Sequence, residues 1–111
     1  EATSDEGNGM NVGWLDAGDW MSYPEVDIPT SGTYEVSYRV ASLNGGGRLQ
    51  IERAGGYPIY GAIDIPSTGG WQNWITVKHR IELEAGTQRF GIFVINGGWN
   101  INWYEIKAVS P

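Results

Sequence analysis

The chain has 111 residues, including 17 glycines, six tryptophans and no cysteine, and its formal net charge is −6. This length predicts a single domain over residues 1–111, built on one modest core. The lack of cysteine excludes disulfide scaffolds, thiolate metal sites and cysteine nucleophiles. The acidic balance, without a Lys/Arg cluster, argues against nucleic acid and against an anionic membrane surface as partners. Six tryptophans exceed what one small core needs, so we expect some on the surface.

The first clear element is predicted over residues 33–42, where apolar and polar side chains alternate with period two. The polar face carries Glu35, Ser37 and Arg39, and the other face carries aromatic and β-branched side chains. Residues 49–51 repeat the pattern briefly. Strict alternation of this kind is typical of a half-buried β-strand.

Residues 71–85 form the longest stretch without glycine or proline and are the best helix candidate. Their apolar side chains nevertheless recur at every second position, which predicts a strand. The alternation continues over residues 90–94. A final strand is predicted over residues 99–109, with a β-bulge because Trp103 and Ile106 are out of phase. No segment favours a helix.

Glycine-containing turns separate these strands at short intervals. Asn44-Gly45 and Asn96-Gly97 are expected to supply the positive φ that tight connections require. Seven or eight short strands joined in this way predict an all-β fold, a β-sandwich of the jelly-roll type.

Catalytic patterns are weak in this sequence. A glycosidase needs one carboxyl group as acid and another as base or nucleophile, and nothing distinguishes such roles for the close pair Asp16 and Asp19. Capping of a turn by solvated carboxylates explains them better. His79 lies in an apolar alternation, so a core or half-buried histidine is favoured over a member of a catalytic triad. The glycines at 45–47 precede a strand and not a helix, which argues against a phosphate loop.

The tryptophans divide by their surroundings. Trp14, Trp71 and Trp99 lie in or beside glycine-rich loops, where few neighbouring side chains can bury them. We therefore expect exposed rings there, with packing under the loops as the open alternative. Trp103 and Trp74 follow the inward period of their strands and are expected to pack in the core.

An exposed indole ring is suited to stacking on the C–H face of a pyranose. Burying about 100 Å² of apolar surface in such a stack contributes on the order of 2 to 3 kcal/mol. Asn100 and Asn102, beside Trp99, supply amide groups for sugar hydroxyls. Rings and amides together indicate recognition of a neutral sugar.

Four segments carry a family resemblance. They are VGWLDAGDWMSY at 12–23, YRVASLNGGG at 38–47, GGWQNW at 69–74 and GGWNINW at 97–103. In this order they cover nearly the whole chain, and the chain resembles the family 6 carbohydrate-binding modules. The resemblance implies a β-jelly roll without catalytic activity, attached to a secreted polysaccharide-degrading enzyme.

The resemblance also implies a main site in the loops at one end of the sandwich. By position in the motifs, Trp14 and Trp71 would sandwich a sugar ring, and Asn100 would form a hydrogen bond to it. Glu1 would accept hydrogen bonds from sugar hydroxyls.

A second site, on the concave face of a sheet, is implied for some members of the family. Its positions here are Trp20 and Glu52, with Ser22 and Tyr23 nearby. Phe93 stands where a related module carries a polar side chain, which implies a drier and weaker cleft.

Family members usually begin with an additional strand, which helps to bind a structural calcium ion. This chain starts after that strand, so we expect a jelly roll without it and one open sheet edge. Asn102 falls near the C-terminal calcium ligand of the family. Calcium is therefore a possible structural cofactor, with Asn102 as a possible ligand.

The expected function is non-catalytic binding of polysaccharide, with β-glucan (β-1,3 or mixed-linkage) favoured. The module would be secreted and monomeric, and would hold a covalently linked glycoside hydrolase on its substrate. Xylan and agarose are the alternative ligands. Two other classes stay open: a small β-sandwich glycoside hydrolase or lyase, and a protein-interaction domain that uses its aromatic loops as a hot spot.

Overall fold

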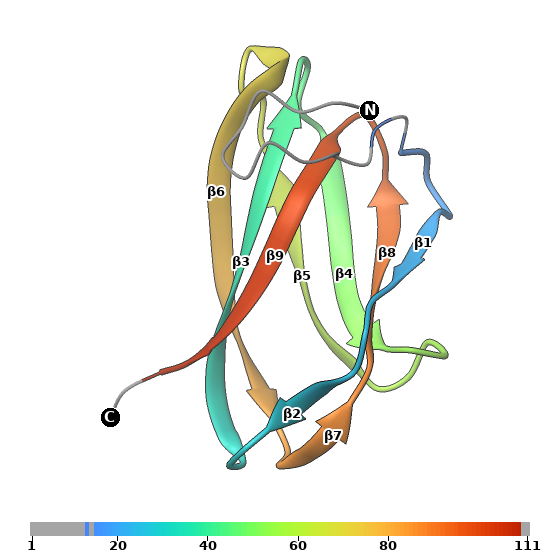
Figure 1. Cartoon of the computed structure of the whole chain (residues 1–111). Helices are drawn as coiled ribbons and strands as arrows, with labels where there is room; N and C mark the ends of the chain where they lie inside the picture. The colour runs from blue at the N-terminus through green and yellow to red at the C-terminus, as the bar shows by residue number, and fades with distance from the viewer. Residues whose placement is uncertain (1–12, 14, 110–111) are drawn as a thin grey trace.

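The structure is a computed structural model that describes residue 13 and residues 15–109. Nine strands and no helix form from these residues (Figure 1). In chain order the strands are β1 (Trp20–Ser22), β2 (Val26–Ile28), β3 (Gly32–Ser42), β4 (Gly47–Arg53), β5 (Ile59–Ile65), β6 (Gly70–Leu83), β7 (Gly86–Gln88), β8 (Phe90–Asn96) and β9 (Asn100–Ala108). Within the described ranges, therefore, no helix is present that could cross a membrane.

Two antiparallel sheets face each other and form a sandwich. One sheet has the order β1-β8-β4-β5 and the other the order β6-β3-β9. Strands β2 and β7 form a separate short pair, which lies at the lower end in Figure 1. Along the chain, β2 follows β1 and β7 precedes β8. The all-β sandwich expected from the alternating strands is confirmed. The expected lack of the family's N-terminal strand concerns a part of the chain outside the described ranges and stays a prediction.

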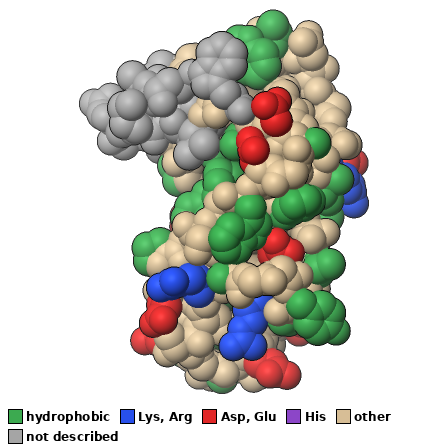
Figure 2. Space-filling model, turned by 90° about the vertical axis from the view of Figure 1, so that its right-hand side faces the viewer, with side chains coloured by type: hydrophobic (Ala, Val, Ile, Leu, Met, Phe, Trp, Pro, Cys, Tyr) green, Lys and Arg blue, Asp and Glu red, His purple; other side chains and the backbone are tan. Residues whose placement is uncertain are grey.

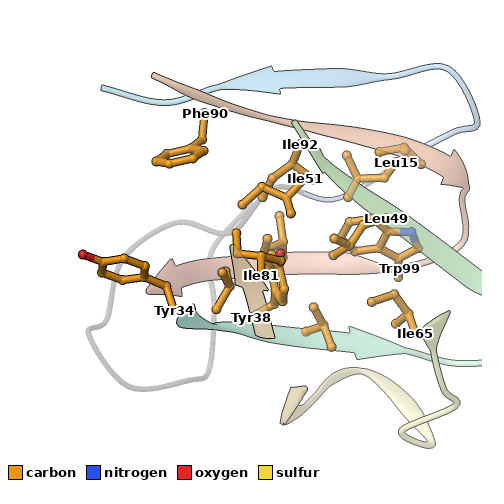
Figure 3. Packing of buried hydrophobic residues seen from close by; sticks show 14 of the residues in the cluster. Leu15, Tyr34, Tyr38, Leu49, Ile51, Ile65, Ile81, Phe90, Ile92 and Trp99 are labelled. Carbon is orange, nitrogen blue, oxygen red and sulfur yellow. The ribbon is translucent and has the colours of Figure 1, made fainter. Parts of the chain in front are cut away.

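The core lies between the two sheets and takes the inward side chains of both (Figure 3). Val36, Tyr38 and Val40 of β3 are fully buried, as their period predicts, and they face Leu49 and Ile51 of β4 across the core. The outward positions of these strands stay in contact with solvent and are free to carry polar or binding groups.

The predicted strand over residues 71–85 is confirmed as β6, which pairs with β3 along most of its length. The predicted bulge in the last strand is also confirmed. Arg39 lies opposite Trp103 and Val40 lies opposite Ile101, so Asn102 is the extra residue of β9.

This bulge changes the face of one tryptophan. Trp103 is paired with Arg39 on the outward side of the sheet, and it is half-buried. Trp74 precedes the inward Ile75 and is likewise half-buried outside the core cluster. The expectation that both rings pack in the core was wrong. The β9 bulge puts Trp103 on the outward side, and Trp74 adjoins the inward Ile75, so the alternation of the strand turns it to the other face.

The two predicted turns use glycine for different reasons. Gly45 has φ +75°, as expected from Asn44-Gly45. In the second turn the left-handed φ, +87°, belongs to Gly98 and not to Gly97. Gly97 is required for space, since a Cβ atom there would lie 2.2 Å from the carbonyl oxygen of Leu15.

Candidate binding sites

The first candidate site lies at the end of the sandwich where β6 and β9 begin. Trp71, the second residue of β6, is 44% exposed, in agreement with its predicted exposure. Asn100, the first residue of β9, is buried, and its Nδ2 donates a hydrogen bond of 2.8 Å to the carbonyl oxygen of Trp71. The structure therefore brings Trp71 and Asn100 together, with the asparagine holding the backbone that carries the ring.

Beside Trp71 lies a hollow of about 420 Å³, which we call the loop-end site. Its lining residues come from three separate segments of the chain: Leu15, Asp16, Trp71, Gln72, Gly98, Trp99 and Asn100. The hollow combines an apolar wall with amide and carboxylate groups, which is the composition of a small-ligand site.

Trp99 belongs to the floor of this site and not to its exposed wall. It is 1% exposed, and its Nε1 donates a hydrogen bond of 2.8 Å to the carbonyl oxygen of Asn96. Figure 3 shows its ring in the core cluster with Leu49 and Leu15. Of the two open alternatives, packing under the loops holds for Trp99, because Gly47 leaves room for its ring: a Cβ there would lie 2.4 Å from Trp99 Cδ1.

A buried hydroxyl group joins the loops of this end, and the sequence reasoning missed it. Ser42 Oγ donates to the carbonyl oxygen of Gly98 at 2.7 Å and accepts from the backbone N–H of Gly45 at 3.0 Å. Thr68 Oγ1 accepts from the N–H of Ser42 at 3.0 Å. A small polar residue at the end of an apolar strand, just before an Asn-Gly turn, was the available signal.

Two predicted members of the main site, Trp14 and Glu1, lie outside the described residues. Asp16 and Asp19 form a capped turn, as expected: Asp19 Oδ2 accepts from the N–H of Asp16 at 2.9 Å, and the N–H of Asp19 donates to the Asp16 carbonyl oxygen at 3.0 Å.

His79 is half-buried, as its place in an apolar alternation predicts. Its Nε2 lies 2.8 Å from the hydroxyl oxygen of Tyr38. Burial lowers the pKa of His79 below its ordinary value, while a backbone hydrogen bond at Ala62 opposes that shift. Its hydrogen-bond partner lies in the core, so the ring has a structural place there.

The second candidate site lies on the outward face of the β1-β8-β4-β5 sheet, and we call it the sheet-face site. Trp20 is 45% exposed, and its Nε1 donates to Glu52 Oε1 at 2.9 Å. Gln50 Nε2 donates to Glu52 Oε2 at 3.2 Å. Both carboxylate oxygens of this buried glutamate are therefore held in position, and each keeps capacity for a further hydrogen bond.

The space for the Trp20 ring is provided by Gly91, which the sequence reasoning did not identify. A Cβ at Gly91 would lie 2.6 Å from Trp20 Nε1, so the indole lies directly over the glycine. Ser22, opposite Gly91, is exposed, and the half-buried Phe93 lies opposite Trp20. Figure 2 views this side of the molecule and shows hydrophobic side chains over the middle of the face, with an acidic group beside them.

The predicted calcium ligand, Asn102, lies in the last strand. The described part of the chain contains no group of three or more His, Cys, Asp or Glu side chains that could hold an ion. Asn102 is the half-buried extra residue of the β9 bulge. Calcium is also held by backbone and amide oxygens, so structural calcium, with Asn102 as a ligand, stays a prediction.

Comparisons with known proteins find a matching family and similar solved structures. The family described as carbohydrate binding module (family 6) matches residues 1–108. The chain is 54% identical to the carbohydrate binding module of lichenase 5A from Cellvibrio mixtus, solved in complex with cellotriose. That match has a TM-score of 0.97 and covers 99% of this chain and 86% of that chain. A β-1,3-glucan binding module of the same family from Bacillus halodurans is 33% identical, with a TM-score of 0.88 over 97% of this chain and 84% of that chain.

Longer proteins also contain a similar segment. The chain is 45% identical to part of the clotting factor G alpha subunit of Tachypleus tridentatus over 109 residues, which is 98% of this chain and 16% of that protein. The chain spans only 16–20% of the length of the curated relatives it matches. The family match over nearly all of the sequence, together with the shared sandwich, shows that the chain belongs to family 6 of the carbohydrate-binding modules and is a non-catalytic domain that binds carbohydrate.

Proposed function

We propose that this module binds β-glucan, with β-1,3 or mixed linkages, in the loop-end site and thereby holds an appended glycoside hydrolase on its substrate. The observation that carries the proposal is the half-exposed ring of Trp71 on the wall of a hollow of about 420 Å³, with the Asn100 amide beside it. The ring offers an apolar face to the C–H groups of a pyranose, and the amide offers hydrogen bonds to its hydroxyls.

The size of the expected interaction follows from surface burial. Stacking of one sugar on Trp71 that buries about 100 Å² of apolar surface contributes on the order of 2 to 3 kcal/mol. With a second ring, predicted to be Trp14, and a few hydrogen bonds, the total corresponds to dissociation constants in the micromolar to millimolar range.

The preference for β-glucan is supported by the ligands of the similar modules. One was solved with cellotriose, a β-1,4-linked glucan fragment, and another is described as binding β-1,3-glucan. Xylan and agarose stay the alternative ligands, because their pyranose rings can also stack on an aromatic side chain.

Affinity electrophoresis against laminarin, barley glucan, xylan, a soluble cellulose derivative and agarose tests the ligand class. We expect retardation by the first two polymers, and Trp71→Ala should reduce it. Leu43→Ala removes a similarly exposed apolar side chain outside the hollow and serves as the control. Retardation by xylan or agarose alone would contradict the β-glucan proposal, and retardation by none of the polymers would favour a protein-interaction domain.

The sheet-face site is proposed as a second glycan site. Trp20 supplies the stacking ring, and the fixed Glu52 carboxylate accepts hydrogen bonds from sugar hydroxyls. The matching experiment is Trp20→Ala beside Trp71→Ala and the double variant. If the two sites act independently, each single variant keeps part of the binding and the double variant loses it.

The wider setting also belongs to this proposal. A secreted, monomeric module joined to a catalytic module follows from the resemblance, and sedimentation of the isolated module tests the monomeric state. Structural calcium can be tested by thermal denaturation with and without a chelator. A bound ion would raise the midpoint of unfolding in calcium, and an unchanged midpoint would contradict it.

A further inference from the structure

The connection between β4 and β5 carries the most exposed aromatic side chain among the described residues. Tyr57 is 82% exposed, and Ile59, two residues later, is 54% exposed. Figure 1 shows this hairpin projecting from the end of β4, away from the β6-β3-β9 sheet. Large apolar side chains in such positions gain nothing from the core, which raises the question of what they contact.

The hairpin has a defined backbone that fixes the position of Tyr57. The N–H of Gly56 donates to the Arg53 carbonyl oxygen at 2.9 Å, and the N–H of Arg53 donates to the Pro58 carbonyl oxygen at 3.0 Å. The N–H of Ala54 donates at 2.9 Å to the carbonyl oxygen of Arg89, just before β8. Tyr57 is thus presented from a hairpin that is tied to the sheet on both sides of the turn.

Gly55 and Gly56 explain why the ring is bare. Both have left-handed φ values, +109° and +103°, and neither offers a side chain to cover Tyr57. The same Gly-Gly-aromatic pattern places Trp71 at the wall of the loop-end site. Two preceding glycines permit such exposure but do not impose it, since Trp99 after Gly97-Gly98 is buried.

This exposed pair is continuous with the sheet-face site. Ile59 is the pairing partner of Glu52 across β4 and β5. A Cβ atom at Gly56 would lie 4.0 Å from Glu52 Oε2, while Glu52 Oε1 is bonded to Trp20 at 2.9 Å. Glu52 therefore has the Trp20 ring on one side and the Ile59–Tyr57 hairpin on the other.

We propose that Tyr57, with Ile59 beside it, forms an additional sugar-binding subsite that extends the sheet-face site past Glu52. A glycan chain with one residue on Trp20 places its next residues over the Glu52 carboxylate and then against the Tyr57 ring. This inference rests on the proposed glycan binding by the sheet-face site. It adds that this face recognises a longer stretch of chain than Trp20 and Glu52 span.

A glycan fits this surface better than a protein partner does. An aromatic ring, an acceptor carboxylate and a second aromatic ring alternate along it, which matches the alternation of C–H faces and hydroxyl groups along a sugar chain. A stable protein interface needs about 800 Å² from each partner, with an apolar centre. Here the centre of the surface is the carboxylate of Glu52.

Isothermal titration with mixed-linkage and β-1,4-linked gluco-oligosaccharides of increasing length tests the subsite. All proteins carry Trp71→Ala, so that the titration measures the sheet-face site alone. In this background Tyr57→Ala should weaken binding of a hexasaccharide about tenfold and leave binding of a disaccharide unchanged, because only the longer ligand reaches the hairpin. Tyr57→Phe keeps the ring and should retain most of the affinity. Leu43→Ala, at the opposite end of the sandwich, is the control for loss of an exposed apolar side chain.

The outcomes separate the subsite from the function on which it rests. Equal hexasaccharide affinity for the parent and Tyr57→Ala would overturn the subsite and leave sheet-face binding intact. Equal losses for the disaccharide and the hexasaccharide would also overturn it, since a remote subsite cannot affect the short ligand. If the Trp71→Ala parent binds neither ligand, glycan binding by the sheet face is wrong and the subsite falls with it.

Discussion

The loop-end site and the sheet-face site present similar groups on different kinds of support. At the loop end, Trp71 depends on turns that are held together by buried polar groups, including Asn100 and Ser42. On the sheet face, Trp20 and Glu52 stand on paired strands and are joined directly to each other. Substitutions of the residues that hold the loops together should therefore disturb both fold and binding, whereas substitutions of the exposed Trp71 ring or on the sheet face should disturb binding alone.

The space around one glycine at each site shows this difference. A Cβ at Gly97 would meet the backbone of Leu15 and Asp16, at 2.2 and 2.8 Å, and backbone cannot move aside cheaply. The three atoms nearest to a Cβ at Gly91 would all belong to the indole of Trp20, at 2.6 to 2.9 Å, and a side chain can rotate away. The same chemical change, one methyl group, should thus have different consequences at the two sites.

The largest effect is expected for Gly97→Ala. The clash with the Leu15 carbonyl forces the two loops apart, and we expect a loss of about 3 kcal/mol in the free energy of unfolding. Urea denaturation measures it. Gly98→Ala is the matched control: its Cβ meets nothing within 4 Å, and only its left-handed φ of +87° is unfavourable, at about 1 kcal/mol. Equal losses for both variants would show that space at Gly97 is not the cause.

Ser42→Ala should follow in size. It leaves the part-buried N–H of Gly45 without its acceptor and the Gly98 carbonyl without its donor, which costs about 2 kcal/mol of unfolding free energy. The loop-end affinity should fall as well, because Gly98 lines that hollow. Ser67→Ala removes an exposed hydroxyl that donates to the Leu43 carbonyl oxygen, and should change stability by less than about 0.5 kcal/mol. A change in stability without any change in affinity would separate the polar contacts from the site.

Gly91→Ala should affect the sheet face alone. The displaced Trp20 loses its hydrogen bond to Glu52, and we expect about tenfold weaker glycan binding by this face, with less than about 1 kcal/mol lost in stability. Titration in a Trp71→Ala background, with thermal denaturation in parallel, measures both quantities. A large loss of stability would contradict the distinction between the two supports.

The smallest expected effect is that of pH on stability, through the half-buried His79, which belongs to neither site. Burial lowers the pKa of His79 in the folded state, so the unfolded chain takes up the proton first as the pH falls. Stability should therefore be complete above the ordinary histidine pKa of about 6.5 and should decrease below it. We expect the thermal midpoint to fall between pH 7.5 and 5.5, by less in His79→Gln, with the relative affinities of the two sites unchanged. An equal fall in both proteins would assign the effect to other groups.

Much of the architecture was predictable, because a strand produces an alternating pattern of side chains in its own sequence. The period of two over residues 71–85 predicted the strand β6, although the long stretch without glycine or proline made a helix the alternative. The phase change near Trp103 predicted the β9 bulge. The face on which Trp103 lies was not predictable, because it depends on which residue of β9 is unpaired. That choice is made by the register with β3.

The sites divide in the same way. A motif resemblance brought Trp71 together with Asn100, and Trp20 together with Glu52, and the structure places each pair in contact. The roles of Gly91 and Ser42 were not predicted, because both depend on residues far away in the chain. A Cβ at Gly91 would meet Trp20, and Ser42 Oγ donates a hydrogen bond to the Gly98 carbonyl oxygen. Trp14 and Glu1 stay predictions for the loop-end site.

The aromatic residues separate what the sequence determined from what the tertiary structure decided. By itself the sequence determined that the chain forms an all-β sandwich with more rings than one core needs, because periodicity and composition are local properties. Three rings follow a pair of glycines, at 55–57, 69–71 and 97–99, and their local sequences are nearly alike. Only the tertiary structure decided that Tyr57 and Trp71 stay exposed while Trp99 is buried. The physical reason is Gly47, which lies against the Trp99 ring from another strand and leaves the space that the ring fills.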